Sequence, residues 1–156
     1  MILSGKALRC VLPHRPPMLL VDQVDLNLAE RTAVGHKSIT AVEPCYGRCE
    51  STGGIAYPPG LVLESMLQTC AALWVSLRRV EVAEAADPTL LFGKAERVRF
   101  LGSARPGQVL RHHIAIAKQI GGVAFMSGRT TCDGELMVVA ESLVGATGRP
   151  RPDRSA

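Results

Sequence analysis

A single carboxylate interrupts the most apolar stretch of the chain. Residues 61–79 (LVLESMLQTCAALWVSLRR) contain neither glycine nor proline, and Glu64 is their only acidic residue. A carboxylate in such surroundings is costly unless it is paired with another group or used in chemistry. We therefore interpret Glu64 as a candidate general acid or base. The alternative is a carboxylate near the start of a helix that backbone amides satisfy.

Gln68 is the next polar residue of interest, because it follows Glu64 by four residues. Residues four apart lie one turn apart on the same face of a helix. Gln68 could therefore hold the Glu64 carboxylate, or it could satisfy backbone groups nearby. The sequence leaves both roles open.

The chain has four histidines, and none of them lies between His36 and His112. His112 and His113 are neighbours on an expected strand, so they point to opposite faces and cannot act as one pair. We expect surface or sheet roles for both. A role for His14 as a base is suggested by the family resemblance described below. The alternative for His14 is a structural role, with its ring hydrogen-bonded to the backbone.

The cysteine count favours a reducing compartment. The chain has an odd number of cysteines, and its apolar start is too short for a signal peptide, so we expect free thiols and a cytoplasmic location. Cys45 and Cys49 could form half of a zinc site, but no second ligand pair follows at zinc spacing, so we expect no metal. Cys49 has no visible partner that would activate it as a nucleophile.

Length and composition indicate one globular domain. The chain has 156 residues, of which 47% are hydrophobic and 21% charged, and this excludes a largely disordered protein. The net charge of +4 comes from scattered lysines and arginines, which argues against a nucleic-acid surface. A membrane span needs about 20 apolar residues. Only 13 residues separate Glu64 from Arg78, so we expect a buried helix rather than a span.

Hydrophobic periodicity places this helix within a series of strands. Residues 43–60 hold four glycines and three prolines, which predicts a long loop before the helix over residues 61–79. Two glycine-containing pairs, Gly121-Gly122 and Asp133-Gly134, predict hairpin turns. The expected strands are residues 18–26, 32–40, 90–101, 109–118, 123–132 and 135–144.

The ends of the chain are expected to contribute little. Pro13, Pro16 and Pro17 argue against a helix within residues 1–17, and residues 148–156 are typical of a frayed tail. Residues 1–147 therefore form one expected α+β domain, a curved antiparallel sheet wrapped around one long buried helix. Such a sheet leaves one edge open and usually dimerises.

Three motifs carry a family resemblance. Residues 12–22 read LPHRPPMLLVD, Glu43 and Pro44 form an EP pair, and residues 58–68 read PPGLVLESMLQ. With the order of elements above, these motifs resemble the (3R)-hydroxyacyl-acyl carrier protein dehydratases of fatty-acid synthesis, which have the hot-dog fold. The resemblance covers roughly residues 10–145.

The resemblance implies an activity and its partners. The expected reaction is dehydration of a (3R)-3-hydroxyacyl thioester to the trans-2-enoyl thioester, in fatty-acid or polyketide-type biosynthesis. The substrate would be carried on the phosphopantetheine of an acyl carrier protein, with no other cofactor. Each site of this family lies at a dimer interface, so a homodimer or a heterodimer with a homologous subunit is expected.

The loop before the helix departs from the family pattern. The family has a catalytic histidine in a G-H-F-P-G loop, whereas this chain reads Gly47-Arg48-Cys49-Glu50-Ser51. The family glycine whose amide polarises the thioester carbonyl is replaced by Pro59, which has no N–H. Gly60 could supply this amide if the loop shifts by one residue.

The site implied by the resemblance therefore has two parts. Its catalytic residues are Glu64 and His14, and its substrate-binding residues are Leu12, Pro13, Gly60 and Gln68. Tyr46 and Tyr57 could shape the mouth of an acyl tunnel. Cations that could meet an acidic carrier protein, or simply face solvent, are Arg78, Arg79, Arg97, Arg99 and Arg105.

Two other functions stay open because the usual histidine is missing. The chain could be a non-catalytic or half-site partner subunit of a heterodimeric dehydratase. It could also be a hot-dog acyl thioesterase, which would hydrolyse the thioester without forming an enoyl product.

Overall fold

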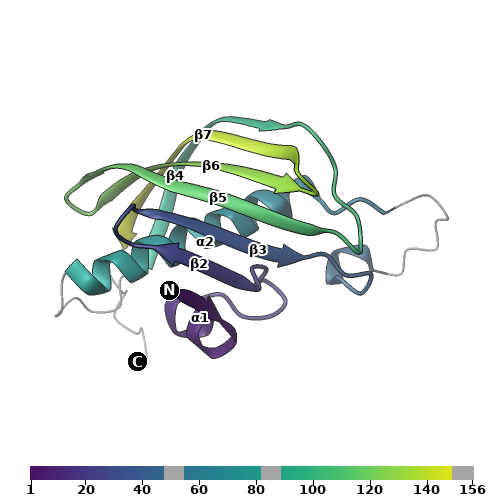
Figure 1. Ribbon diagram of the computed structural model, residues 1–156, viewed down its shortest axis with the longest axis horizontal. Coiled ribbons are helices and arrows are strands. Elements are labelled where there is room, and N and C mark those ends of the chain that lie inside the picture. Colours follow the sequence, from purple (N-terminus) through teal and green to yellow (C-terminus); the bar gives the residue numbers. More distant parts are fainter. Residues whose placement is uncertain (48–54, 82–88, 149–156) are drawn as a thin grey trace, which may run out of the picture.

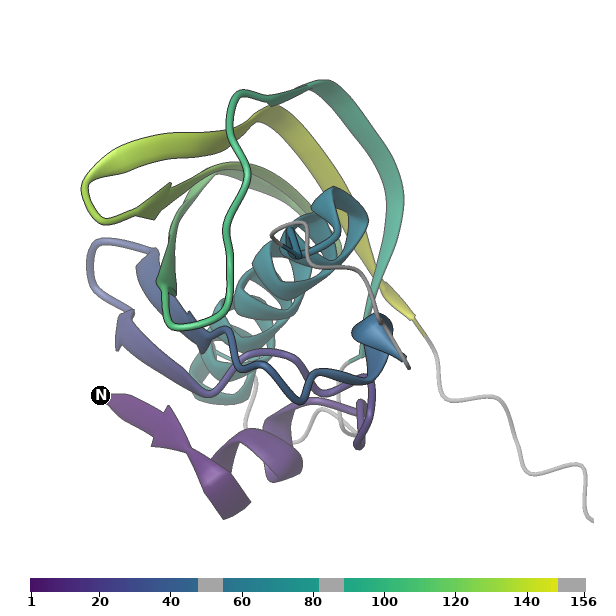
Figure 2. The same ribbon diagram turned by 90° about the vertical axis from the view of Figure 1, so that its right-hand side faces the viewer.

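The computed structural model describes residues 1–47, 55–81 and 89–148, which form one curved sheet around one long helix. The sheet is antiparallel, with the strand order β1-β2-β3-β5-β6-β7-β4. Figures 1 and 2 show how it curls around helix α2. The strands are β1 (Ile2–Ser4), β2 (Gln23–Asn27), β3 (Thr32–Ser38), β4 (Thr89–Phe100), β5 (Val109–Ile120), β6 (Val123–Cys132) and β7 (Glu135–Gly148). The helices are α1 (Gly5–Val11), α2 (Pro59–Glu81) and the 3-10 turn η1 (Pro44–Tyr46).

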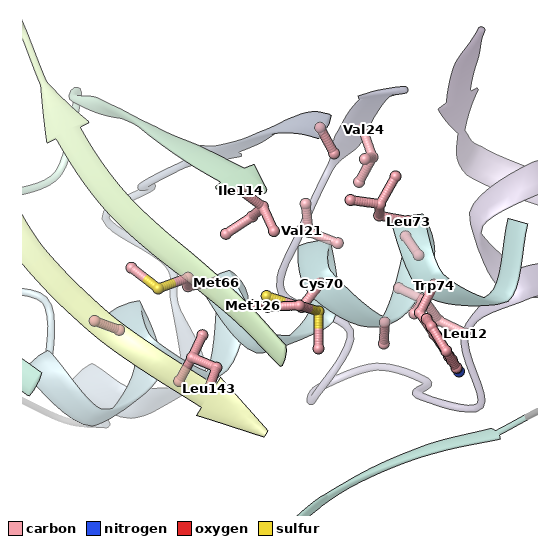
Figure 3. Packing of buried hydrophobic residues seen from close by; sticks show 14 of the residues in the cluster. Leu12, Val21, Val24, Met66, Cys70, Leu73, Trp74, Ile114, Met126 and Leu143 are labelled. Atoms are coloured by element: carbon pink, nitrogen blue, oxygen red, sulfur yellow. The ribbon is translucent and has the colours of Figure 1, made fainter. Parts of the chain in front are cut away.

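Helix α2 is the centre of the hydrophobic core. Met66, Cys70, Leu73 and Trp74 are fully buried on it, and Figure 3 shows them among side chains from the surrounding sheet. By length and composition α2 could cross a membrane, but 72% of its most apolar window is buried inside the protein. The expectation of a buried core helix is therefore confirmed.

The predicted hairpins are present, and the turn between β6 and β7 shows why its sequence matters. Asp133 and Gly134 both have positive φ angles, 51° and 86°, as a type I′ turn requires. β6 has the expected bounds, while β7 continues to Gly148, four residues beyond the predicted strand. The tail over residues 149–156 lies outside the described residues.

The prediction for the N-terminus is wrong. Residues 2–11 form β1 and α1, because the prolines that exclude a helix all follow Val11. Leu3 and Leu8 anchor these elements in the core, and the amino group of Met1 donates to the carbonyl of Leu26 at 2.8 Å. These elements are too short to show a clear hydrophobic period in the sequence.

The first predicted strand is also shorter than expected. β2 begins at Gln23, whereas the prediction began at residue 18. The amides of Leu20 and Val21 bond the side chain of Gln68 instead of a neighbouring strand. The Gln68 side chain of α2 therefore takes the place of strand-to-strand hydrogen bonds here and holds residues 20–21 against the helix.

The strand register sets which residues face α2. Gly35 of β3, His112 of β5, Thr130 of β6 and Val138 of β7 are directly paired neighbours, and all of them are buried. Because side chains alternate along a strand, His113 and Arg129 belong to the opposite, outer face. The register confirms that His112 and His113 point to opposite faces.

Gly35 allows α2 to approach the sheet closely. A Cβ atom added to Gly35 would lie 2.0 Å from Oγ1 of Thr69. We expect Gly35→Ala to lower the free energy of unfolding by about 1–3 kcal/mol, because an overpacked core must shift to make room. Urea denaturation would measure the loss. Gly93→Ala is the control, since no atom lies within 4 Å of its added Cβ. Thr69→Ala should restore part of the loss in Gly35→Ala, and a Gly35→Ala protein as stable as wild type would contradict this packing.

β4 forms one edge of the sheet. It spans 12 residues and pairs with β7 alone among the described strands. Leu91 and Phe100 on β4, and Leu101 just after it, are large hydrophobic residues exposed to solvent. The unpaired backbone groups of such an edge strand are a template for pairing with another chain.

Candidate active site

Glu64 lies on α2 but not in its first turn. The helix begins at Pro59, two residues earlier than predicted, so Glu64 is its sixth residue and is too far from the free amides of the N-terminus to be capped by them. Its side chain is 30% exposed. Oε1 of Glu64 accepts a hydrogen bond of 2.8 Å from Nε2 of Gln68 and lies 3.4 Å from Nε2 of His14. Side chains therefore hold this carboxylate, and the alternative of a helix-start carboxylate satisfied by backbone amides is wrong.

Gln68 fulfils both roles that the sequence left open. Its Oε1 accepts from the amides of Leu20 at 2.9 Å and Val21 at 3.3 Å. Its Nε2 donates to the carbonyl of Met18 at 2.7 Å and to Glu64. The orientation of the amide is fixed by these partners, because a flipped amide would set donor against donor and acceptor against acceptor. Gln68 thus joins the segment after His14 to the turn of α2 that carries Glu64.

His14 is placed beside Glu64 in the same chain. Its side chain is 33% exposed, and its Nδ1 is buried without a hydrogen-bond partner among the described residues. The alternative of a ring bonded to the backbone through Nδ1 is therefore not seen. Arg15 shapes this segment, since its guanidinium donates to the carbonyls of Arg9, Leu12 and His14 at 3.0, 2.8 and 2.7 Å.

The substrate-binding candidates are placed differently. Gly60 lies one turn before Glu64, in the first turn of α2, where a backbone N–H has no intrahelical partner. An added Cβ at Gly60 would meet no atom within 4 Å, so the side-chain direction of this residue is open. Pro13 is exposed, whereas Leu12 is only 1% exposed and packs in the core near Trp74 (Figure 3). Contact of Leu12 with an acyl chain stays a prediction.

The loop candidates are described only in part. Arg48, Cys49, Glu50 and Ser51 lie outside the described residues. Burial and the Glu43 carboxylate raise the pKa of the Cys45 thiol, which disfavours a thiolate there. No cluster of metal-ligating side chains occurs within the described ranges.

A buried ion pair fixes the start of this loop, and the sequence analysis missed it. Nζ of Lys37 donates to Oε1 of Glu43 at 2.6 Å, and the ring of Tyr57 lies 5.9 Å from the same Nζ. Burial raises the pKa of Glu43, but the hydrogen bonds from Lys37 and Thr40 outweigh it, so the net pKa lies below its ordinary value. Tyr57 is buried, so it supports the loop from inside.

The arginines proposed to meet a carrier protein are mostly engaged within the chain. Arg78 pairs with Glu81 at 3.1 Å, and Arg79 donates to the carbonyl of Cys10 at 2.8 Å. Arg97 and Arg99 both approach Glu141, at 2.6 and 3.4 Å. They are spread over the end of α2 and the strand β4, so they do not form one patch.

A cavity of about 620 Å³ opens on the outer face of the sheet, over the paired residues Val34, His113, Arg129 and Val139. His14 and Glu64 are not among its lining residues. Burial and the nearby cations Arg129 and Arg111 lower the pKa of His113. This face is separated from the His14–Glu64 pair by the sheet and the core.

A second buried network lies one residue along α2 from Glu64, and the sequence analysis missed it too. Oγ of Ser65 lies 2.7 Å from Nε2 of His112, whose Nδ1 lies 2.8 Å from Oγ1 of Thr130. Burial, with small contributions from His113 and His36, lowers the pKa of His112 from 6.5 to about 3. His112 is therefore neutral in the folded protein at neutral pH. On its strand His112 shares a face with the apolar Leu110 and Ile114, which is a signal of burial, but Ser65 gave no signal by itself.

The burial of His112 predicts that the free energy of unfolding depends on pH. As pH falls below 6.5, the unfolded chain protonates His112 while the folded chain does not until about pH 3. The free energy of unfolding should therefore fall by up to about 1.4 kcal/mol per pH unit in this window. In His112→Gln the slope should be smaller by this contribution, while His113 and Glu43, whose pKa values are also lowered, still contribute. Urea unfolding at a series of pH values would measure it, with His113→Gln as the control that keeps most of the slope. Equal slopes in wild type and His112→Gln would contradict the prediction.

Comparison with known proteins agrees with this architecture. The family model described as a FabA-like domain matches residues 12–141. The chain belongs to the FabA-like domain family. The members most similar to it include the 3-hydroxyacyl-acyl-carrier-protein dehydratase FabZ of Moorella thermoacetica, 36% identical over 86% of this chain and 94% of the relative. The FabZ of Chloroflexus aggregans is 34% identical over 94% of this chain and 97% of the relative.

Solved structures show that this FabA-like chain has the hot-dog fold expected from the sequence. A chain of the dehydratase heterocomplex ApeI:P from Xenorhabdus doucetiae superimposes with a TM-score of 0.72, at 21% identity and with 91% of each chain covered. A hypothetical thioesterase from Streptococcus pneumoniae, solved with coenzyme A, superimposes with a TM-score of 0.56 at 13% identity, covering 78% of this chain and 83% of that one. At these identities the likeness concerns the fold.

Proposed function

We propose that this chain dehydrates (3R)-3-hydroxyacyl thioesters to trans-2-enoyl thioesters on an acyl carrier protein. The observation that carries the proposal is the 3.4 Å contact between Nε2 of His14 and Oε1 of Glu64, which joins a base and an acid in one chain. The names of the FabZ relatives support the substrate class. The phosphopantetheine of the carrier protein is the only cofactor that we propose, and we expect the protein in the cytoplasm.

The pair can supply both proton transfers of the reaction. Neutral His14 takes the C2 proton of the substrate on Nε2, and the C2–H electrons form the C2–C3 double bond. The C3–O bond breaks, and protonated Glu64 gives its proton to the leaving hydroxyl, which departs as water. His14 is then charged and Glu64 ionised. Transfer of the proton from Nε2 to Oε1 across their contact restores the starting state.

The amide of Gly60 is the proposed donor to the thioester oxygen. It lies one turn from Glu64 in the first turn of α2, where the backbone N–H is free and the helix dipole favours negative charge. A donor aimed at the developing enolate oxygen is usually among the largest contributions to such a reaction. This amide replaces the one that Pro59 lacks.

We further propose that a second hot-dog chain covers the β4 edge and completes the acyl tunnel. The 12-residue edge strand with its exposed Leu91, Phe100 and Leu101 supports a second chain there. Size-exclusion chromatography with light scattering would test it. A monomer at micromolar concentration would contradict this part of the proposal.

A second function is favoured by one observation, the lack of any histidine between His36 and His112. The chain would then be the partner subunit of a heterodimeric dehydratase, with the base supplied by a homologue that keeps the loop histidine. The structural likeness to the dehydratase heterocomplex ApeI:P is consistent with such a partner.

One assay separates these functions. The purified chain is incubated with 3-hydroxyacyl-acyl carrier protein, alone and mixed with a histidine-bearing homologue, and enoyl product and free carrier thiol are followed by mass spectrometry. Enoyl product from the chain alone supports a self-sufficient dehydratase. Enoyl product that needs the chain and the homologue together supports the partner subunit, and release of free carrier thiol without enoyl product supports a thioesterase.

A further inference from the structure

The buried network of Ser65, His112 and Thr130 has no part in the proton transfers proposed above. All three residues are fully buried, so no substrate can reach them. Both ring nitrogens of His112 are occupied, Nε2 by Ser65 at 2.7 Å and Nδ1 by Thr130 at 2.8 Å. Either tautomer of the neutral His112 ring can form both hydrogen bonds, because each hydroxyl can donate or accept. The network therefore ties α2 to β5 and β6 by directional bonds.

Directional bonds matter on α2 because most of its buried side chains are apolar, the polar ones being Ser65, Gln68, Thr69 and Ser76. Apolar packing fixes the volume of a core more strongly than it fixes one rotation of a helix within it. Successive residues of a helix are about 100° apart around its axis, so a small rotation would displace Glu64 from His14. Something polar must select the rotation if this contact is to persist.

The turn of α2 that carries Glu64 contacts two different parts of the protein. Glu64 and Gln68 face the segment after His14, and Gln68 bonds three backbone groups there. Ser65 and Thr69 face the sheet, where Ser65 meets His112 and Thr69 packs on Gly35, the strand neighbour of His112. The oxygen Oγ1 of Thr69 is occupied within the helix by the carbonyl of Ser65 at 3.0 Å. The bond from Ser65 to His112 is thus the polar link between this turn and the sheet.

We propose that Ser65, His112 and Thr130 are positioning residues that set the rotation of α2 and thereby aim the Glu64 carboxylate at His14. The effect of these residues on catalysis rests on the proposed function, whereas their effect on the position of the Glu64 carboxylate does not. His112 acts only through Ser65 and never touches the substrate. Apolar side chains of similar shape would keep the core filled but would let this turn of α2 rotate.

The test uses a triple variant, Ser65→Ala with His112→Phe and Thr130→Val. Removing all three polar partners together avoids leaving a buried group unpaired, so the protein should fold. We expect kcat to fall about 10–100-fold with KM within threefold of wild type, because misplacement by about 1 Å is costly in the reaction but not in binding. Ser76→Ala, a buried change farther along α2, should leave both constants unchanged.

A matched pair of single variants isolates the hydroxyl. Thr130→Ser keeps the group that meets His112, and Thr130→Val removes it at nearly constant volume. If the network positions Glu64, Thr130→Ser should retain most of kcat, and Thr130→Val should lose several-fold more of it. Equal kcat in these two variants, or a triple variant with kcat within threefold of wild type, would overturn the proposal.

A measurement independent of activity separates this inference from the proposed function. The ¹⁵N signals of the His14 ring report its contact with Glu64, and Glu64→Ala, which removes both side-chain oxygens, gives the reference for a lost contact. In the triple variant these signals should move toward that reference. Unchanged His14 signals would overturn the inference even if the enzyme is active. A wild-type protein that forms no enoyl product would overturn the proposed function, and the His14 signals would still decide the positioning role.

Discussion

Replacing Glu64 with glutamine should lower kcat for dehydration by about 10²–10⁴-fold, the usual contribution of a general acid. Glutamine keeps the shape of the side chain, and its oxygen can still accept from Nε2 of Gln68. It cannot donate a proton to the departing hydroxyl. Steady-state kinetics with 3-hydroxyacyl-acyl carrier protein would measure the loss, with thermal unfolding to show that the fold is kept.

The control for Glu64→Gln is Glu96→Gln, which neutralises an exposed carboxylate of β4 paired with Lys94 at 2.8 Å. It should retain the wild-type kcat. A Glu64→Gln protein with unchanged dehydration would remove Glu64 from the mechanism. The partly buried side chain of Glu64 would then serve only to accept the hydrogen bond from Gln68.

Replacing Gln68 with leucine should lower the free energy of unfolding by about 3 kcal/mol or more. The change leaves the amides of Leu20 and Val21 and the carbonyl of Met18 without their partner, and each unsatisfied buried group costs about 1–3 kcal/mol. It also frees the Glu64 carboxylate, so kcat should fall in the protein that remains folded. Urea denaturation and kinetics at a temperature below the transition would measure both effects.

Gln119→Leu is the matched control, because among the described residues Nε2 of Gln119 makes only long contacts of 3.4 and 3.5 Å. It should change stability by less than about 0.5 kcal/mol. If Gln68→Leu is no less stable than this control, then the three hydrogen bonds from Gln68 to Met18, Leu20 and Val21 do not hold residues 18–21 against α2.

The sequence predicted the parts of the molecule that have a clear hydrophobic pattern or residues typical of one type of turn. The apolar run of α2 and the Asp133-Gly134 turn belong to this group, and both are present. The motif around His14 and the carboxylate at position 64 also pointed to one site, although no period in the sequence says that the two side chains meet. Gln68 links the two segments that carry them, because it bonds Glu64 and reaches across 48 residues of sequence to bond Leu20.

The features that the sequence did not predict are polar contacts between distant segments. Ser65 and His112 are 47 residues apart, and each residue type alone is common in a surface or a core position. The pair of Lys37 and Glu43 was hidden for another reason, since two charged residues beside a loop are usually solvated. Their burial is seen only in three dimensions, where the ring of Tyr57 lies 5.9 Å from Nζ of Lys37.

One chain carries both members of the His14–Glu64 pair, and this has a genetic consequence. Suppose that a His14→Gln chain and a Glu64→Gln chain are co-expressed and assemble together. If His14 and Glu64 act as the proposed base and acid, no subunit in such a mixture has both of them intact, so we expect two defective alleles not to rescue each other. A site whose acid and base came from opposite subunits would regain one working centre in every mixed dimer.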